Sequence, residues 1–152
     1  MRRPAARVHG VAAELFVDAS AWYPLLVRRL PQHAAVAAAL QDAVRQGARV
    51  VTTNLVVAET HALLLRRTSR DAALAFARGV AAPPNVIVRS SAELERVAVT
   101  DWLERYDDQD FSFADALSFA VMTERGISDA LTLDPHFAAA GFRVVPARGP
   151  AS

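Results

Sequence analysis

The chain has 152 residues, of which 53% are hydrophobic and 22% are charged. These proportions exclude a disordered or collagen-like chain, and no apolar run reaches the length of about 18 residues that indicates a membrane span. The 17 basic and 16 acidic side chains give a formal net charge of +1, so bulk charge alone does not hold this protein on a nucleic acid.

Two residue types are absent from the sequence. There is no cysteine, which excludes disulfides, cysteine-ligated metal sites and thiol nucleophiles. All 17 basic residues are arginine, which excludes the lysine of a Walker A phosphate loop and a Schiff-base lysine.

The N-terminal residues begin with arginines but lack the apolar stretch of a signal peptide, so we expect a cytoplasmic protein. We expect a disordered lead-in over residues 1–14 and a single domain over residues 15–147. Within that domain, short apolar runs predict strands, and these are residues 15–17, 49–52, 86–88, 130–133 and 143–145.

Helical periodicity and capping signals fill the segments between the strands. The first helix begins near Ser20, and Asn54 is the expected N-cap of the third. The other expected helices are residues 32–46, 71–80, 91–106 and 112–125. Short apolar strands that alternate with helices predict an α/β fold, in which helices cover both faces of a central parallel sheet.

Two acidic residues directly follow expected strands. Asp18 comes after the first strand and Asp134 after the fourth. The carboxyl edge of a parallel sheet is where α/β proteins bind ligands. Both residues also suit a structural role, since Asp18 can form a turn and Asp134 precedes a proline that is typical of a helix start.

Two further acids lie on expected helices. Glu59 has apolar residues one turn before and after it, which predicts that it is buried, either in a functional site or in an ion pair with an arginine. Asp115 stands three residues after Ser112, a spacing that also suits a capping box. If all four carboxylates converge, a cation is needed to balance them. Oxygen ligands favour Mg²⁺ or Mn²⁺, whose bound water can hydrolyse a phosphodiester.

Four segments in this order resemble the motifs of PIN-domain nucleases, and most of all the VapC-like toxin ribonucleases. The segments are Phe16–Ser20, Thr53–Glu59, Phe111–Ala116 and Leu131–Phe137. The resemblance implies a Rossmann-like PIN fold, one or two Mg²⁺ or Mn²⁺ ions, hydrolysis of RNA, a homodimer and a cognate antitoxin. It implies that the metal ligands, direct or through water, are Asp18, Glu59, Asp115 and Asp134.

The same resemblance suggests auxiliary residues. Ser20 matches a small polar residue of the first motif and would orient Asp18 or a water. Some family members carry an acid where His136 stands, and this histidine either touches a substrate phosphate or packs in a helix start. Asp110 is an auxiliary acid or part of a solvated turn. The candidate RNA-binding residues, which equally suit solvated helix ends, are Arg28, Arg29, Arg66, Arg67 and Arg70.

Three other functions were considered, and two of them remain open. A phosphatase of the haloacid-dehalogenase type would need a second acid at the position of Ser20 and a lysine, and the chain has neither. A PIN fold can also act as a non-catalytic binding module, although retention of all four acids opposes this. A PIN nuclease of RNA processing, without an antitoxin, fits the residues as well as a toxin does.

Overall fold

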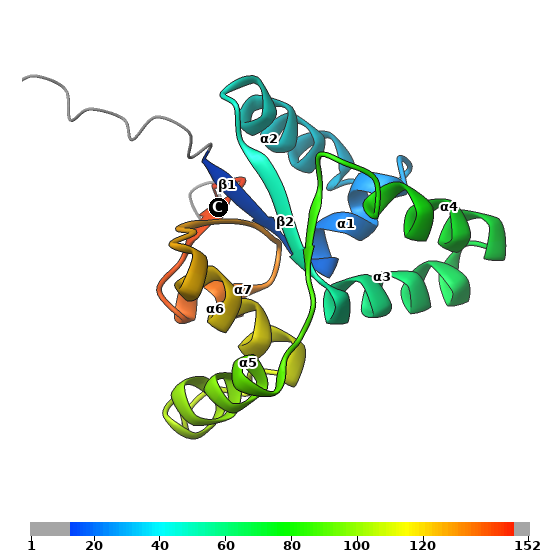
Figure 1. The fold of residues 1–152 in the computed structure, drawn as a ribbon. Coiled ribbons are helices and arrows are strands. Elements are labelled where there is room, and N and C mark those ends of the chain that lie inside the picture. Colours follow the sequence, from blue (N-terminus) through cyan, green and yellow to red (C-terminus); the bar gives the residue numbers. More distant parts are fainter. Residues whose placement is uncertain (1–12, 148–152) are drawn as a thin grey trace, which may run out of the picture.

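The computed structural model describes residues 13–147, so residues 1–12 of the expected lead-in lie outside the described chain. A five-stranded sheet with the order β3-β2-β1-β4-β5 forms the centre, and every strand pair is parallel. The expected α/β architecture is therefore confirmed (Figure 1). The strands are β1 (Glu14–Val17), β2 (Arg49–Thr53), β3 (Val86–Val88), β4 (Asp129–Leu131) and β5 (Arg143–Val145).

The helices form two layers, one on each face of the sheet (Figure 1). Right-handed crossovers place the helices that follow β1 and β2 on one face and the segments that follow β3 and β4 on the other. The first layer contains α1 (Ala19–Leu26), α2 (His33–Arg45), α3 (Asn54–Arg67) and α4 (Arg70–Val80). The second contains α5 (Ala92–Val97), the π-helix η1 (Ala98–Glu104), α6 (Phe113–Arg125) and α7 (Pro135–Ala139).

The order of the strands reverses next to β1. The chain proceeds from β1 to β2 and β3 on one side, and then returns to the other side of β1 to form β4. Ligands of open α/β sheets bind at such a switch point, outside the carboxyl ends of the strands. Val17 pairs with Leu131, so Asp18 and Thr132 leave the sheet side by side at this point.

Buried aromatic rings fasten the second helical layer to the sheet. Phe16 of β1, Phe119 of α6 and Phe137 of α7 are all fully buried. The ring of Phe137 lies 6.1 Å from that of Phe16 and 4.9 Å from that of Phe119, between ring centroids. These contacts hold the starts of α6 and α7 close to the switch point.

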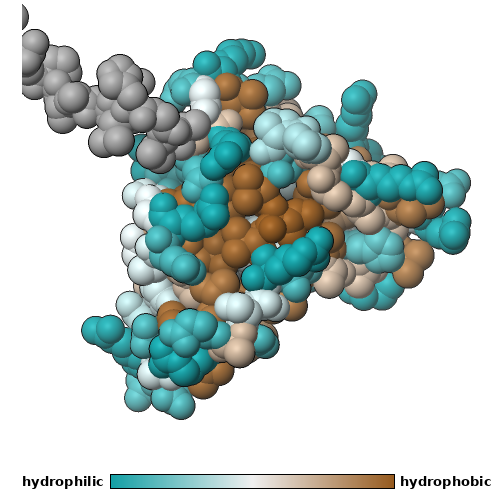
Figure 2. Space-filling view, in the orientation of Figure 1, coloured by the Kyte–Doolittle hydropathy of each residue, from teal (hydrophilic) through white to brown (hydrophobic). Residues whose placement is uncertain are grey.

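Strand β3 is one edge of the sheet. Its residues Val86, Ile87 and Val88 are half-buried, because only β2 pairs with them. Apolar side chains gather in the middle of the face seen in Figure 2, where β3 crosses the view in Figure 1.

Ion pairs connect the elements at the amino-terminal ends of the strands, which is the end of the sheet away from the switch point. Glu14 accepts two hydrogen bonds from the Arg125 guanidinium, at 3.1 and 2.8 Å, and one from Arg49 at 3.0 Å. The hydrogen bonds from Arg125 are the main cause that lowers the pKa of Glu14. This network ties β1 to β2 and α6, and it extends β1 one residue beyond the expected start.

Two of the predicted boundaries that were wrong have clear local causes. Thr53, not Asn54, caps α3, because the Thr53 hydroxyl accepts the Val56 N–H at 3.1 Å. The Asn54 side chain instead accepts the Ser90 N–H at 2.8 Å and holds the segment after β3. Strand β4 ends at Leu131 rather than at residue 133, because the next backbone groups turn toward Ser20. Among the described helices, none combines the length and apolarity needed to cross a membrane.

Candidate active site

Asp18 lies directly after β1 and is only 5% exposed. It caps α1, and its Oδ2 accepts the Ser20 hydroxyl at 2.8 Å, the Thr132 hydroxyl at 3.1 Å and the Ser20 N–H at 3.3 Å. Asp18 therefore has the expected turn role, and its carboxylate also lies at the switch point of the sheet. Burial raises the pKa of Asp18, bonds from Ser20 and Ala19 lower it, and the charge of Asp115 raises it further.

The two hydroxyl groups at Asp18 have defined directions. The Leu133 N–H donates to Ser20 Oγ at 2.9 Å, and the Asp134 N–H donates to Thr132 Oγ1 at 3.0 Å. Each hydroxyl has a single hydrogen, which it donates to Asp18. The segment after β4 thus orients the carboxylate after β1.

Asp115 lies in the first turn of α6 and is buried. Its Oδ2 accepts the Ser112 N–H, while Ser112 Oγ accepts the Asp115 N–H, both at 3.0 Å. The capping box is therefore present, with aspartate in the place of the usual glutamate. It does not compete with a site role, since the cap sets the direction in which the carboxylate points.

Asp134 caps the short helix α7, with Pro135 in its first position. Its Oδ1 accepts the His136 N–H at 2.9 Å. The ring nitrogen Nδ1 of His136 lies 3.1 Å from Asp115 Oδ2 and 3.4 Å from Asp134 Oδ1. His136 therefore packs in a helix start, as one of the two alternatives expected, and its ring also contacts two of the candidate acids.

Glu59 is exposed, so the prediction that it is buried was wrong. The buried positions of α3 are Val56, Thr60 and Leu64, and Glu59 lies beside this stripe. Among residues 13–147, no arginine pairs with Glu59. Partial loss of solvent around its carboxylate, and then the charges of Asp18, Asp115 and Asp134, raise the pKa of Glu59. All four acids are therefore close enough to interact electrostatically.

The other candidate residues lie away from this cluster or serve it indirectly. Asp110 is exposed in the turn before α6. The five arginines are exposed on the segment after α1, at the end of α3 and at the start of α4. Helix α3, with 14 residues, is about 21 Å long, so its arginines stand far from its first turn.

Thr132 was not among the predicted site residues, although it is 1% exposed and its hydroxyl donates a hydrogen bond to Asp18. The available signal was a threonine within the predicted apolar strand of residues 130–133, two residues before Asp134. A buried hydroxyl in that position needs a partner, and Asp18 provides it.

A cation fits the donor atoms at this edge. One ligand atom each from Asp115, Asp134 and His136 lie within 4.8 Å of one another. Carboxylate oxygens are the ligands that Mg²⁺ and Mn²⁺ take in proteins. Like charges so close, with a buried third acid nearby, are best balanced by a bound cation.

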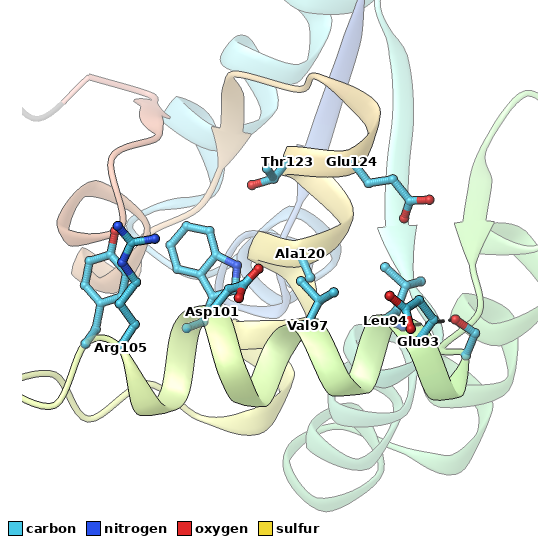
Figure 3. Close-up of a pocket in the computed structure, with 11 residues that line it drawn as sticks. Glu93, Leu94, Val97, Asp101, Arg105, Ala120, Thr123 and Glu124 are labelled. Carbon is cyan, nitrogen blue, oxygen red and sulfur yellow. Dashed lines mark hydrogen bonds between the residues drawn. The ribbon is translucent and has the colours of Figure 1, made fainter.

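A separate hollow of about 540 Å³ lies between the α5–η1 segment and α6. Figure 3 shows Glu93 and Asp101 on one side of it, opposite Thr123 and Glu124 of α6. None of the four clustered acids lines this hollow, so the candidate active site is a different place in the molecule.

Comparison with known proteins agrees with this geometry. The family model of the PIN domain matches residues 15–143. The 23S rRNA-specific endonuclease VapC20 of Mycobacterium tuberculosis, found in two strains, is 43% identical over 93 residues, which are 61% of this chain and 70% of that protein.

Solved structures give the same result. The crystal structure of M. tuberculosis VapC20, described as a Sarcin-Ricin loop cleaving toxin, has a TM-score of 0.76 at 36% identity and covers 84% of this chain and 95% of its own. VapBC2 from Rickettsia felis, solved with a DNA fragment of its promoter, has a TM-score of 0.66 at 9% identity, with 86% and 96% covered, and shows the fold alone.

The fold is a parallel sheet with an acid cluster at its switch point, and the family model matches nearly all of it. Together they define the class of protein. The chain belongs to the PIN-domain family. The resemblance of its motifs to VapC-like toxins is likewise confirmed.

Proposed function

We propose that this protein is a Mg²⁺- or Mn²⁺-dependent endoribonuclease and the toxin of a toxin–antitoxin pair. One observation carries the proposal: Asp18, Asp115 and Asp134 converge at the switch point of the sheet, with ligand atoms of Asp115 and Asp134 within 4.8 Å of each other. Partial loss of solvent, and then the charges of these three acids, raise the pKa of Glu59. Four interacting carboxylates at the edge where α/β folds bind ligands favour a cation site.

In this proposal, the four acids hold the cation directly or through water. When bound, the cation supplies an activated water and neutralises the non-bridging oxygens of a phosphate. Ser20 and Thr132 orient Asp18 from the closed side of the site. Glu59 is the exposed member, so the RNA enters from its side. Attack by water leaves a 5′-phosphate and a 3′-hydroxyl.

The proposed substrate is a structured loop of ribosomal RNA. The support is the similarity to VapC20, a 23S rRNA-specific endonuclease, at 43% identity. The exposed arginines after α1 and around the α3–α4 junction would bind RNA phosphates at a distance from the cleaved bond. These residues are Arg28, Arg29, Arg66, Arg67 and Arg70.

The proposed partners are a small antitoxin and a second copy of the chain, both in the cytoplasm where the RNA is found. Toxin–antitoxin complexes among structures of the same fold support the antitoxin. We also propose that the nuclease domain is a single unit that extends to residue 147. It begins at Glu14, the first residue of β1, so the expected boundary at residue 15 was one residue too late.

The test is cleavage of ribosomal RNA by the purified chain. We expect cleavage with Mn²⁺ or Mg²⁺, 5′-phosphate ends on the products, and no cleavage with EDTA or in Asp115→Asn. Expression should arrest the growth of a bacterial host, and Asp115→Asn should abolish the arrest. Cleavage that persists in both EDTA and the variant would refute the proposed site. Cleavage without growth arrest would favour an RNA-processing nuclease over a toxin.

A further inference from the structure

The imidazole ring of His136 lies between two acids of the site. Its Nδ1 is 3.1 Å from Asp115 Oδ2 and 3.4 Å from Asp134 Oδ1. The backbone N–H of His136 is bonded to Asp134, and its ring stands edge-on to Phe111 at 5.4 Å and 80°. The next residue, Phe137, is fully buried. The ring position is therefore defined by the fold on three sides.

The spacing of these atoms suits two different contacts. Adjacent ligands of an octahedral cation at about 2.1 Å are about 3 Å apart, and a hydrogen bond between nitrogen and oxygen has the same length. However, Nδ1 carries at most one hydrogen, and here it faces carboxylates of two residues. A single cation can contact all three atoms at once. The His136 side chain is 31% exposed, so a cation can reach it from solvent.

We propose that His136 supplies a nitrogen ligand to the cation, so that this site is a mixed nitrogen and oxygen site that favours Mn²⁺ over Mg²⁺. The inference rests on the proposed function, because it concerns the same cation. Imidazole is a good ligand for transition metals, whereas Mg²⁺ takes oxygen ligands and retains its waters. A histidine nitrogen in the ligand set, beside the carboxylates, therefore shifts the selectivity toward Mn²⁺.

Electron paramagnetic resonance of bound Mn²⁺ tests this directly. The full chain, stripped of metal with EDTA and dialysed, is titrated with Mn²⁺, and pulsed spectra are searched for coupling to a ¹⁴N nucleus. We expect the coupling in the wild type and its loss in His136→Ala. The affinity for Mn²⁺ should fall on the order of tenfold in this variant, and the affinity for Mg²⁺ should fall less.

The matched control is His33→Asn. His33 is a half-buried histidine at the start of another helix, α2, where its Nδ1 bonds the Pro24 carbonyl at 2.9 Å. This variant should keep both the ¹⁴N coupling and the affinity for Mn²⁺. Circular dichroism of each variant establishes that it is folded.

The two proposals fail in different ways. If the wild type binds Mn²⁺ without ¹⁴N coupling, and His136→Ala binds it equally well, the nitrogen ligand is refuted and the acid site stands. The same conclusion follows if both ions lose affinity equally and no coupling is seen. If the wild type binds no Mn²⁺ at all, the metal-dependent function itself is refuted.

Discussion

Replacing Asp134 with asparagine should stabilise the metal-free protein. The ligand atoms of Asp134 and Asp115 lie within 4.8 Å of each other, a separation at which two unit charges repel by about 3.5 kcal/mol at an effective dielectric constant of about 20. Asparagine caps a helix as well as aspartate does, so α7 keeps its first turn. Solvent reduces the repulsion, since the Asp134 side chain is 27% exposed, and the charge at the helix start has a favourable contribution of its own.

The net gain should therefore be about 1 kcal/mol, which raises the melting temperature by about 2–4 °C for a domain of this size. The assay is thermal unfolding followed by circular dichroism at pH 8, first with EDTA and then with Mn²⁺. A cation at a hundred times its Kd stabilises the native wild type by about 2.7 kcal/mol. Asp134→Asn should gain less, so the order of the two melting temperatures reverses when Mn²⁺ is added.

Asp42→Asn is the control, because Asp42 is an exposed acid on α2 that pairs with Arg45. Removal of this charge should leave both the metal-free stability and the response to Mn²⁺ unchanged. The reasoning is refuted if Asp134→Asn melts below the wild type in EDTA and Mn²⁺ shifts neither protein.

Three further predictions concern Asp18, its hydroxyl partner and the far edge of the sheet. Burial raises the pKa of Asp18 above the ordinary 3.8, so the folded protein loses stability as the pH rises from about 4 through the raised value. Asp18→Asn in EDTA should therefore exceed the wild-type melting temperature by a margin that grows as the pH is raised from 4 to 8, and a shrinking margin would contradict this. Thr132→Val should lower RNA cleavage and Mn²⁺ affinity by about tenfold, whereas Thr132→Ser should restore both. The control is Thr52→Val, which removes the hydrogen bond from another fully buried hydroxyl to the Val17 carbonyl and should cost only about 1 kcal/mol of stability. If the two valine variants reduce cleavage equally, the role of Thr132 is only structural. Finally, hydrogen bonds from Arg125 lower the pKa of Glu14 below 4.5, so its stabilising contribution is present above that pH and is lost as the pH falls. Glu14→Gln should lower the free energy of unfolding at pH 7 by about 1 kcal/mol and leave RNA cleavage unchanged. A variant that is as stable as the wild type at pH 7, or that cleaves less RNA, would contradict this prediction.

The fold could be predicted because its strands are short, apolar and bounded by turn signals. The expected strands at residues 86–88 and 143–145 match β3 and β5, and the other three differ by one or two residues at their ends. The errors have local physical causes. Asparagine is a common N-cap residue, but the side chain of Asn54 accepts a hydrogen bond from the Ser90 N–H, and the preceding residue, Thr53, caps the helix instead.

The site could be predicted only where one residue carries the signal by itself. Asp18 and Asp134 follow strands, and Asp115 completes a capping box, so their positions are visible in local sequence. The contact of Ser20 with Thr132 joins residues 112 positions apart, and no local pattern indicates such a pair. The exposure of Glu59 depends on which side of α3 faces the sheet. Apolar residues occur on several sides of this helix, so the sequence pattern does not identify the buried side.

The location of a bound cation tests the central claim most directly. Crystals soaked with Mn²⁺, measured with X-rays near the manganese absorption edge, give anomalous density at the ion alone. We predict one or two peaks at the carboxyl ends of β1 and β4, among Asp18, Asp115 and Asp134, and none at these positions in Asp115→Asn. A saturating soak that gives no peak there, or a peak only elsewhere on the molecule, would contradict the assignment of these carboxylates as the metal site.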